Sequence, residues 1–309
     1  MRISGLIDLH MHTTVSDGTD TPEEILLNVK KTGITVFSIT DHDAVQSSRI
    51  VPDLLKEGDP VYIPGAEFSC RDEEGKYHIL GYGYDPKAEP ILKLVERSHG
   101  NRMKKVQARL DFLKDEFGFS FPEEEISALL SLSNPGKPHI GNLMVKYGYA
   151  STKEEAITDY INKLHFPSIY LLPQEAIEAI LESGGIPVLA HPSYGSGDQL
   201  ILGDEMKLRL ERLKSMGLQG AEAYYSGFTP RLRQDILDFA EYFGLYVTAG
   251  SDYHGSNKLV QLGDTGLKKD AEIPEGMKRF LDNCMGYSHE QGRAPVIRIL
   301  ETDEKDRRE

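Results

Sequence analysis

Histidines and carboxylates recur in this sequence in short groups, each of which follows a run of apolar residues. One residue separates His10 from His12, and one residue separates Asp252 from His254. In an extended strand alternate residues point to the same face, so the members of each pair can reach one metal ion. Mixed imidazole and carboxylate ligands suit zinc, manganese or iron. These pairs therefore indicate divalent-metal chemistry.

Further residues of the same types stand between the two pairs. The additional ligand candidates are Asp17, His42, Glu67, His78 and His191. A single histidine after a strand is more often a hydrogen-bonded core residue than a ligand. Recurrence changes that interpretation, because a barrel active site requires such residues at the ends of its strands and core packing does not. We therefore predict that all of these residues form one metal cluster.

The predicted chemistry assigns roles within and beside this cluster. Glu67, Asp252 and His254 are the candidate catalytic residues. Metal ions a few ångströms apart lower the pKa of a bridging water, so a metal-bound hydroxide is the expected nucleophile. Asp8 and Asp41 can orient ligand imidazoles from behind, because a metal-bound histidine usually donates its other N–H to a carboxylate. Capping or solvation at a strand end is the alternative for both aspartates.

The elements that must position these residues alternate between strand and helix. Thr21-Pro22-Glu23-Glu24 is a capping box, which predicts a helix from about Pro22 to Lys31 that is closed by Gly33. A later helix is predicted at Gln174–Glu182. Apolar and β-branched runs predict strands at Ile3–Leu9, Ile34–Thr40, Val61–Gly65, Lys76–Tyr84, Ile186–Ala190, Gly220–Tyr224 and Leu245–Ala249. Repeated strand–helix units predict an α/β fold with a mostly parallel sheet.

A middle segment of the chain has a helical pattern instead. Apolar residues mark one face of a long helix at Met103, Val106, Leu110, Leu113 and Phe117. Further helical stretches run through 123–130 and 153–164. We therefore predict a discontinuous α/β domain, residues 1–88 and 168–309, interrupted by a helical insertion at 89–167.

Charge and hydropathy restrict the partners. The chain carries 35 basic and 49 acidic residues, for a net charge of −14. Such a surface repels long polyanions, so a small anionic substrate attracted by bound cations is expected, and long duplex nucleic acid is not. No apolar stretch approaches the roughly twenty residues that cross a bilayer, and the strand at Ile3–Leu9 leaves no room for a cleavable signal peptide. We expect a cytoplasmic protein without membrane contact.

Taken in order, these motifs resemble the PHP superfamily, named for polymerase and histidinol phosphatase domains. The resemblance covers about 1–88 and 185–260. It rests on His10-Met11-His12, Asp17-Gly18, Thr40-Asp41-His42, Glu67, Ala190-His191-Pro192 and Ser251-Asp252-Tyr253-His254. The resemblance implies a distorted (β/α)7 barrel that binds two or three divalent ions, which the motifs do not identify among manganese, iron and zinc.

The resemblance also implies how the ligands divide. One ion would take His10, His12, Glu67 and Asp252. A second ion would share Glu67 and use His78 and His191. A third ion would take Asp17, His42 and His254.

The insertion is similar to the helical cap of the PHP subgroup that hydrolyses nucleotide and oligonucleotide phosphates. The similarity rests on Gly136-Lys137-Pro138-His139-Ile140 and on Tyr147-Gly148-Tyr149, with Lys137 where members usually carry Arg. It implies that Lys137 and His139 bind substrate, although a solvated loop explains them nearly as well.

Together these resemblances imply a metal-dependent phosphoesterase. Its substrate would be a nucleotide, as for a 3',5'-bisphosphonucleotide phosphatase, or a short oligoribonucleotide, as for a 5'-3' exonuclease. Histidinol-phosphate phosphatase is an alternative, against which the cap-like insertion argues. A non-catalytic module stabilised by metals is another.

Overall fold

The computed structural model describes residues 2–3, 5–132, 134–164, 169–195, 199–290 and 299–300. The chain forms two compact units. Met1–Leu94 and Leu172–Glu309 together make up the first, called here the discontinuous unit. Val95–Leu171 makes up the second, called the helical unit. The charged residues at 301–309 lie outside the described residues.

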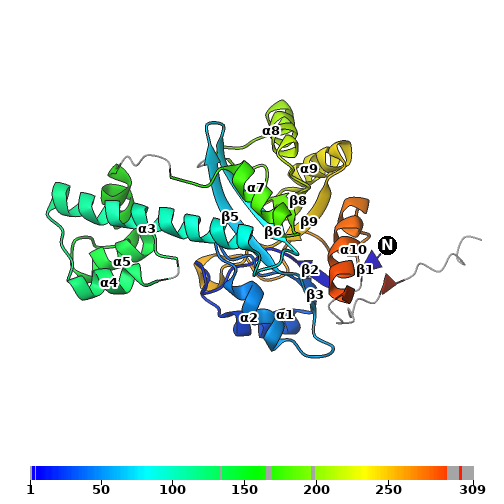
Figure 1. Ribbon diagram of the computed structural model, residues 1–309, viewed down its shortest axis with the longest axis horizontal. Coiled ribbons are helices and arrows are strands. Elements are labelled where there is room, and N and C mark those ends of the chain that lie inside the picture. The colour runs from blue at the N-terminus through cyan, green and yellow to red at the C-terminus, as the bar shows by residue number, and fades with distance from the viewer. Residues whose placement is uncertain are drawn as a thin grey trace, which may run out of the picture. The chain divides into compact units, whose positions relative to one another are not determined.

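The strands of the discontinuous unit form two main sheets (Figure 1). The first is parallel and contains β2 (Leu6–Asp8), β3 (Ile34–Phe37) and β4 (Val61–Tyr62). The second contains, in this order, β5 (Gly65–Asp72), β6 (Gly75–Tyr82), β7 (Ile186–Leu189), β8 (Gly220–Tyr225) and β9 (Tyr246–Gly250). A separate antiparallel pair joins β1 (Arg2–Ile3) to β10 (Ile299–Leu300).

The α/β class is confirmed, but the expectation of a mostly parallel sheet is wrong for the second sheet. β6 runs antiparallel to both β5 and β7. The reason is local: only Glu73 and Glu74 separate β5 from β6, and so short a connection can join only antiparallel strands. β5 itself was not predicted as a strand.

The two sheets are not closed into the continuous barrel that the resemblance implied. Within the described residues, the sheets meet at isolated bridges, Met11 with Tyr253 and His42 with Glu67. Both bridges involve residues beside proposed ligands or the ligands themselves. The seams between the sheets therefore coincide with the predicted cluster.

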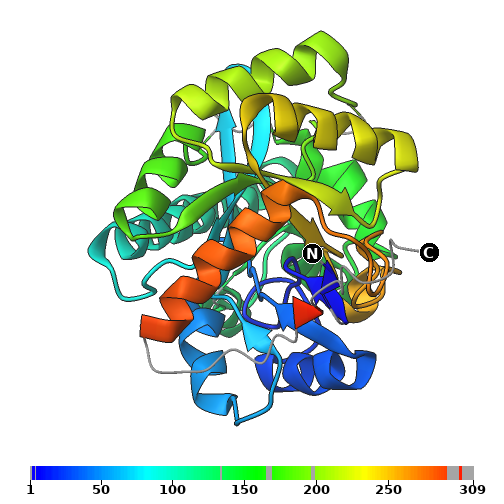
Figure 2. The ribbon, with the colours of Figure 1, turned by 90° about the vertical axis from the view of Figure 1, so that its right-hand side faces the viewer.

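Helices cover the sheets of the discontinuous unit. They are α1 (Pro22–Thr32), α2 (Gln46–Leu54), α7 (Pro173–Glu182), α8 (Gly203–Ser215), α9 (Pro230–Phe243) and α10 (Glu275–Glu290), with a 3-10 turn η3 (Gly255–Asn257). α7 packs on β5, β6 and β7, whereas α9 packs on β8 and α10 on β9 (Figure 2). The predicted capping box of α1 is present, and Gly33 ends that helix with a φ of 78°.

The helical unit contains the predicted long helix. Its elements are α3 (Glu89–Phe117, which begins in the discontinuous unit), α4 (Glu123–Leu130), α5 (Lys137–Lys146), α6 (Lys153–Glu155), a π-helical turn η1 (Ala156–Tyr160) and a 3-10 turn η2 (Ile161–Lys163). Val106, Leu110 and Leu113 are buried in a core with Ile140 and Met144. Among the described helices, none is long and apolar enough to cross a membrane.

Candidate metal centre

The structure brings the predicted ligands together from five parts of the discontinuous unit. The segments that follow β2, β3, β7 and β9 carry His10, His12, Asp17, His42, His191, Asp252 and His254. Glu67 and His78 lie inside the β5–β6 hairpin instead of following a strand. Glu67 is paired with Leu80 and His78 with Ser69, so the two ligand candidates are diagonal neighbours on one face of the hairpin.

Glu67 lies at the middle of the cluster with only 1% of its side chain exposed. Its Oε2 atom is 3.3 Å from His10 Nε2, 3.2 Å from His12 Nε2 and 3.0 Å from His42 Nδ1. None of these four atoms has a hydrogen-bond partner among the described residues, although all are buried. Buried polar atoms normally have partners. Three ring nitrogens that converge on one carboxylate oxygen therefore fit a site for a cation.

The other oxygen of Glu67 faces two further imidazoles. Oε1 lies 2.9 Å from His78 Nδ1 and 3.3 Å from His191 Nε2, and these two ring nitrogens are 3.2 Å apart. The carboxylate thus separates two groups of nitrogen atoms, one on each oxygen. A bridging carboxylate between metal ions has this arrangement.

Asp252 also divides its oxygens between two environments. Oδ1 lies 3.6 Å from His10 Nε2 and 3.4 Å from His12 Nε2. Oδ2 accepts hydrogen bonds from the Tyr225 hydroxyl at 2.9 Å and from the Lys258 ammonium at 2.7 Å. Asp252 has a φ of 59°, a conformation that non-glycine residues adopt mainly where surrounding structure imposes it. Tyr225 and Lys258 were not predicted from the sequence, because neither belongs to a recognisable metal-ligand pattern.

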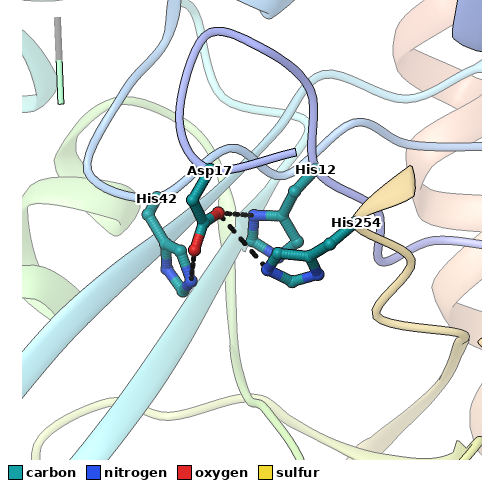
Figure 3. A group of neighbouring side chains, drawn as sticks. All are labelled: His12, Asp17, His42 and His254. Carbon is teal, nitrogen blue, oxygen red and sulfur yellow. Dashed lines mark ion pairs between the residues drawn. The ribbon is translucent and has the colours of Figure 1, made fainter. Parts of the chain in front are cut away.

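Asp17 lies among the rings of His12, His42 and His254 (Figure 3). Its carboxylate lies 3.3 Å from His254 Nε2, 3.7 Å from His12 Nδ1 and 3.8 Å from His42 Nε2. The Asp17 side chain is 48% exposed, in contrast to the buried Glu67. His12, Asp17, His42 and His254 have ligand atoms close enough together to hold one ion.

Burial and the nearby carboxylates act in opposite directions on the pKa values of the surrounding imidazoles, and the balance differs between His12 and His42. Although burial disfavours its charged form, His12 has its pKa raised to about 9 by Asp252 and Glu67. Burial lowers the pKa of His42 to about 3, which outweighs the attraction of Glu67. His42 is therefore neutral at physiological pH and ready to donate a lone pair. His12 holds a proton that a metal ion would displace.

Asp8 and Asp41, proposed above to orient imidazoles, bind backbone and hydroxyl groups directly. Asp8 accepts hydrogen bonds from the amides of His10, Ser251 and Gly263, and burial raises its pKa to about 6. It therefore joins the backbones that follow β2 and β9.

Asp41 accepts a hydrogen bond from the Thr13 amide at 2.7 Å. The hydroxyls of Thr13, Ser16 and Ser47 also donate to its carboxylate. Ser16 Oγ is in turn 3.4 Å from His12 Nδ1. Within the described part of the chain, Asp41 thus reaches an imidazole through this serine.

Glu222 is the carboxylate that directly contacts a ligand imidazole from behind, and the sequence interpretation missed it. It lies inside β8, is fully buried, and places Oε1 2.9 Å from His10 Nδ1. The sequence did contain one indication of this role. Glu222 is the single charged residue in the apolar run Gly220–Tyr225, and a charged side chain is rarely buried in a strand without a partner.

Lys137 and His139 lie in the helical unit, at the start of α5. Lys137 donates to Asn162 Oδ1, and His139 Nδ1 accepts from the Gly136 amide at 3.2 Å. Both residues therefore lie in the first turn of a helix and not in a solvated loop. Pro138 in that turn is typical of a helix start.

Comparison with known proteins gives a consistent result for the family. The sequence profile described as PHP domain matches residues 8–171. A solved structure from Bifidobacterium adolescentis, assigned provisionally to the metal-dependent phosphoesterases, superposes with a TM-score of 0.72 at 27% identity. That match covers 90% of this chain and 96% of the solved one.

Three relatives of known activity match most of the chain. A phosphoribosyl 1,2-cyclic phosphate 1,2-diphosphodiesterase of Eggerthella lenta is 29% identical over 262 residues, covering 80% of this chain and 94% of the relative. A 5'-3' exoribonuclease of Haemophilus influenzae is 26% identical over 272 residues, with coverages of 86% and 96%. A 3',5'-nucleoside bisphosphate phosphatase of Chromobacterium violaceum is 27% identical over 263 residues, with coverages of 80% and 87%.

Proposed function

Because the PHP domain profile matches more than half of its length, the chain belongs to the PHP domain family, and on that premise we propose that it hydrolyses phosphate esters of nucleotides. The observation that carries this proposal is the convergence of imidazole nitrogens on the buried oxygens of Glu67. Divalent ions bound there would supply the activated water and neutralise phosphoryl charge.

We propose the following division of ligands for those ions. His10, His12, Glu67 and Asp252 would hold the first, which agrees with the short contacts of the two carboxylates to both rings. Glu67, His78 and His191 would hold the second. Asp17, His42 and His254 would hold the third, at the more exposed end.

The protein's own groups have distinct parts in the proposed reaction. Glu67 and Asp252 supply negative charge that holds ions close together, and His254 is proposed to act with them at the reacting phosphate. Lys258 adds positive charge beside Asp252, which favours an anionic substrate. Asp17 is half-exposed, so we propose that substrate enters from that end.

The substrate class follows from what the relatives share. Their names denote cleavage of a cyclic phosphate diester, of RNA from its 5' end, and of a nucleoside 3',5'-bisphosphate. We propose a ribose-containing phosphate ester, either a 3',5'-bisphosphonucleotide or the 5' end of a short oligoribonucleotide. A cyclic ribose phosphate is a second candidate, because the diphosphodiesterase has 29% identity to this chain.

The helical insertion, with proposed domain limits at 89 and 167, is proposed to act as a cap for the domain that carries the cluster. Lys137 and His139 are proposed to contact substrate through their positions at the start of α5. Lys137→Ala is then expected to raise KM for an oligoribonucleotide. Lys104→Ala, an exposed lysine on α3, is the matched control and should leave KM unchanged.

A substrate panel tests the proposed activity. Protein loaded separately with manganese, iron(II) or zinc is incubated with a 3',5'-bisphosphonucleotide, a 5'-phosphorylated short RNA, a cyclic ribose phosphate and histidinol phosphate. Release of phosphate or nucleotide should occur with the first or second substrate. Glu67→Gln protein prepared in parallel excludes a contaminating phosphatase. Release from histidinol phosphate alone would favour the alternative phosphatase, and no release with any ion would favour a non-catalytic module.

A further inference from the structure

Glu222 occupies an unusual position for a carboxylate. It lies in the middle of β8, between β7 and β9, and its side chain is fully buried. Its two oxygens have different partners: Oε1 lies 2.9 Å from His10 Nδ1, and Oε2 accepts the backbone N–H of His191 at 2.8 Å. One buried side chain therefore contacts two proposed ligands that are 181 positions apart in the sequence.

We infer that Glu222 is a positioning residue that sets the ring tautomer of His10 and the backbone of His191, and so prepares two ligands for metal. This inference rests on the proposed metal-dependent function. It goes further by assigning a role to a residue that is itself outside the ligand set.

A neutral imidazole carries one ring proton, and its hydrogen-bond partners decide which nitrogen holds it. A carboxylate only accepts hydrogen bonds, so a neutral His10 facing Glu222 must carry its proton on Nδ1. Its Nε2 atom is then left with a free lone pair. Nε2 is buried, has no hydrogen-bond partner among the described residues, and lies 3.3 Å from Glu67 and 3.6 Å from Asp252. Glu222 thus directs the lone pair of His10 toward the cluster.

Glu222 also supports the backbone conformation of His191. This residue has a φ of 29°, in the left-handed region that costs a non-glycine residue free energy. The hydrogen bond from its amide to Glu222 supports that conformation, which presents Nε2 to Glu67 Oε1 at 3.3 Å. Loss of the carboxylate would leave a partly buried amide without this acceptor.

Gly250, at the end of β9, lies directly against the His10–Glu222 pair. A Cβ atom at position 250 would lie 2.2 Å from His10 Cβ and 2.3 Å from Glu222 Oε1. Neither contact can be tolerated without displacement. The neighbouring strand therefore lacks a side chain where the pair needs room.

Glu222→Gln is the sharpest test, because the structure dictates how the amide must turn. The backbone N–H of His191 donates a hydrogen bond and cannot accept one, so the glutamine oxygen must stay on it. The glutamine NH2 group then faces His10 Nδ1 and requires the tautomer with the proton on Nε2, which cannot coordinate metal. The variant keeps the volume and the backbone contact of Glu222 but reverses the tautomer of His10.

Zinc alone serves as the probe, titrated into metal-free protein against a chelating indicator. We expect Glu222→Gln to weaken the binding of at least one ion by about 10- to 100-fold. Its circular dichroism and thermal unfolding without metal should stay near those of wild type. Glu241→Gln, an exposed glutamate on α9, is the matched control and should bind zinc as wild type does.

Equal zinc binding by wild type and Glu222→Gln would overturn the inference. Wild-type protein that binds neither zinc nor manganese would instead overturn the proposed function, so the two failures are distinct. If Glu222→Gln does not fold, nitrogen-15 NMR of zinc-loaded wild type decides the question. His10 should carry its proton on Nδ1, and a proton on Nε2 would overturn the inference.

Discussion

At the scale of single residues, one carboxylate organises the centre. Five imidazoles lie within 3.3 Å of Glu67, and its side chain is buried. A buried carboxylate surrounded by rings with free lone pairs is stable only when protons or cations balance the charge. This balance of charge predicts the effects of substituting Glu67 or Lys258 and of protonating His12.

Glu67→Gln replaces the shared carboxylate by a neutral amide. We expect the loss of at least one ion and a fall in turnover greater than the roughly 10- to 100-fold typical of residues that only support ligands. Elemental analysis and phosphate-release assays measure the two effects. Glu211→Gln, on the exposed face of α8, should change neither. Full activity of Glu67→Gln would show that the cluster is not catalytic.

Metal binding should weaken as the pH falls. In the metal-free protein the pKa of His12 is raised to about 9, so at pH 7 an incoming ion must displace the His12 proton. Apparent affinity should therefore rise with pH up to about 9, by about tenfold per pH unit for each proton released. Zinc titrations at pH 6, 7 and 8 measure this dependence, with the indicator calibrated at each pH. Equal affinities at pH 6 and pH 8 would contradict the assignment.

Lys258→Met removes the ammonium group that contacts Asp252 Oδ2 at 2.7 Å. We expect kcat/KM for an anionic phosphate ester to fall by about five-fold, a modest effect because the lysine side chain is 41% exposed. The difference should shrink at high salt, which screens the charge. Lys268→Met, also exposed, is the control. An equal fall in both variants would mean that position 258 has no special role.

At the scale of elements, the ends of β2, β3, β7 and β9 and the β5–β6 hairpin position the ligands. Met11 bridges to Tyr253 and His42 bridges to Glu67, so the segments that carry ligands hold one another at the seams between sheets. Asp8 strengthens the first seam by accepting backbone amides from both sides of it. The geometry of the centre is therefore coupled to the stability of these strand ends.

Asp8→Ala should destabilise the protein even without metal. The substitution leaves the buried amides of His10 and Ser251, and the partly buried amide of Gly263, without their acceptor, at an expected cost of about 2–4 kcal/mol in the free energy of unfolding. Urea denaturation of metal-free protein measures the change. Asp53→Ala, exposed on α2, should change stability by less than about 0.5 kcal/mol. A similar value for Asp8→Ala would exclude this role.

At the scale of the whole molecule, bound ions connect distant parts of the discontinuous unit. The proposed ligands run from His10 to His254, so an ion that binds them binds only the folded state. An ion that binds only the folded state stabilises a protein by mass action. The acidic surface, with its net charge of −14, also gains from bound cations at its centre.

Removal of metal should lower the melting temperature. An ion present at a hundred times its Kd contributes about 2.7 kcal/mol, which corresponds to a fall of roughly 4 °C on chelation for a protein of this size. Thermal unfolding with and without a chelator measures the shift. Glu67→Gln should respond less than wild type. Identical melting curves for wild type in both conditions would argue against an ion that spans the strand ends.

The sequence alone determined the kinds of residue available and much of the local structure. The spacing in His10-Met11-His12 and the capping box at Thr21 are properties of neighbouring residues, so their patterns are visible without a fold. The long helix of the insertion was predictable for the same reason. The α/β class and the metal-ligand types followed from such local patterns.

Only the tertiary structure decided which groups stand behind the ligands and how the sheets join. Glu222 contacts His10 across 212 positions, and no periodic pattern relates residues so far apart. The antiparallel β5–β6 hairpin placed Glu67 inside a strand, where the sequence had predicted a strand end. Contacts of this kind depend on strand order and register, which arise from packing among distant segments and are not encoded in the spacing of neighbours.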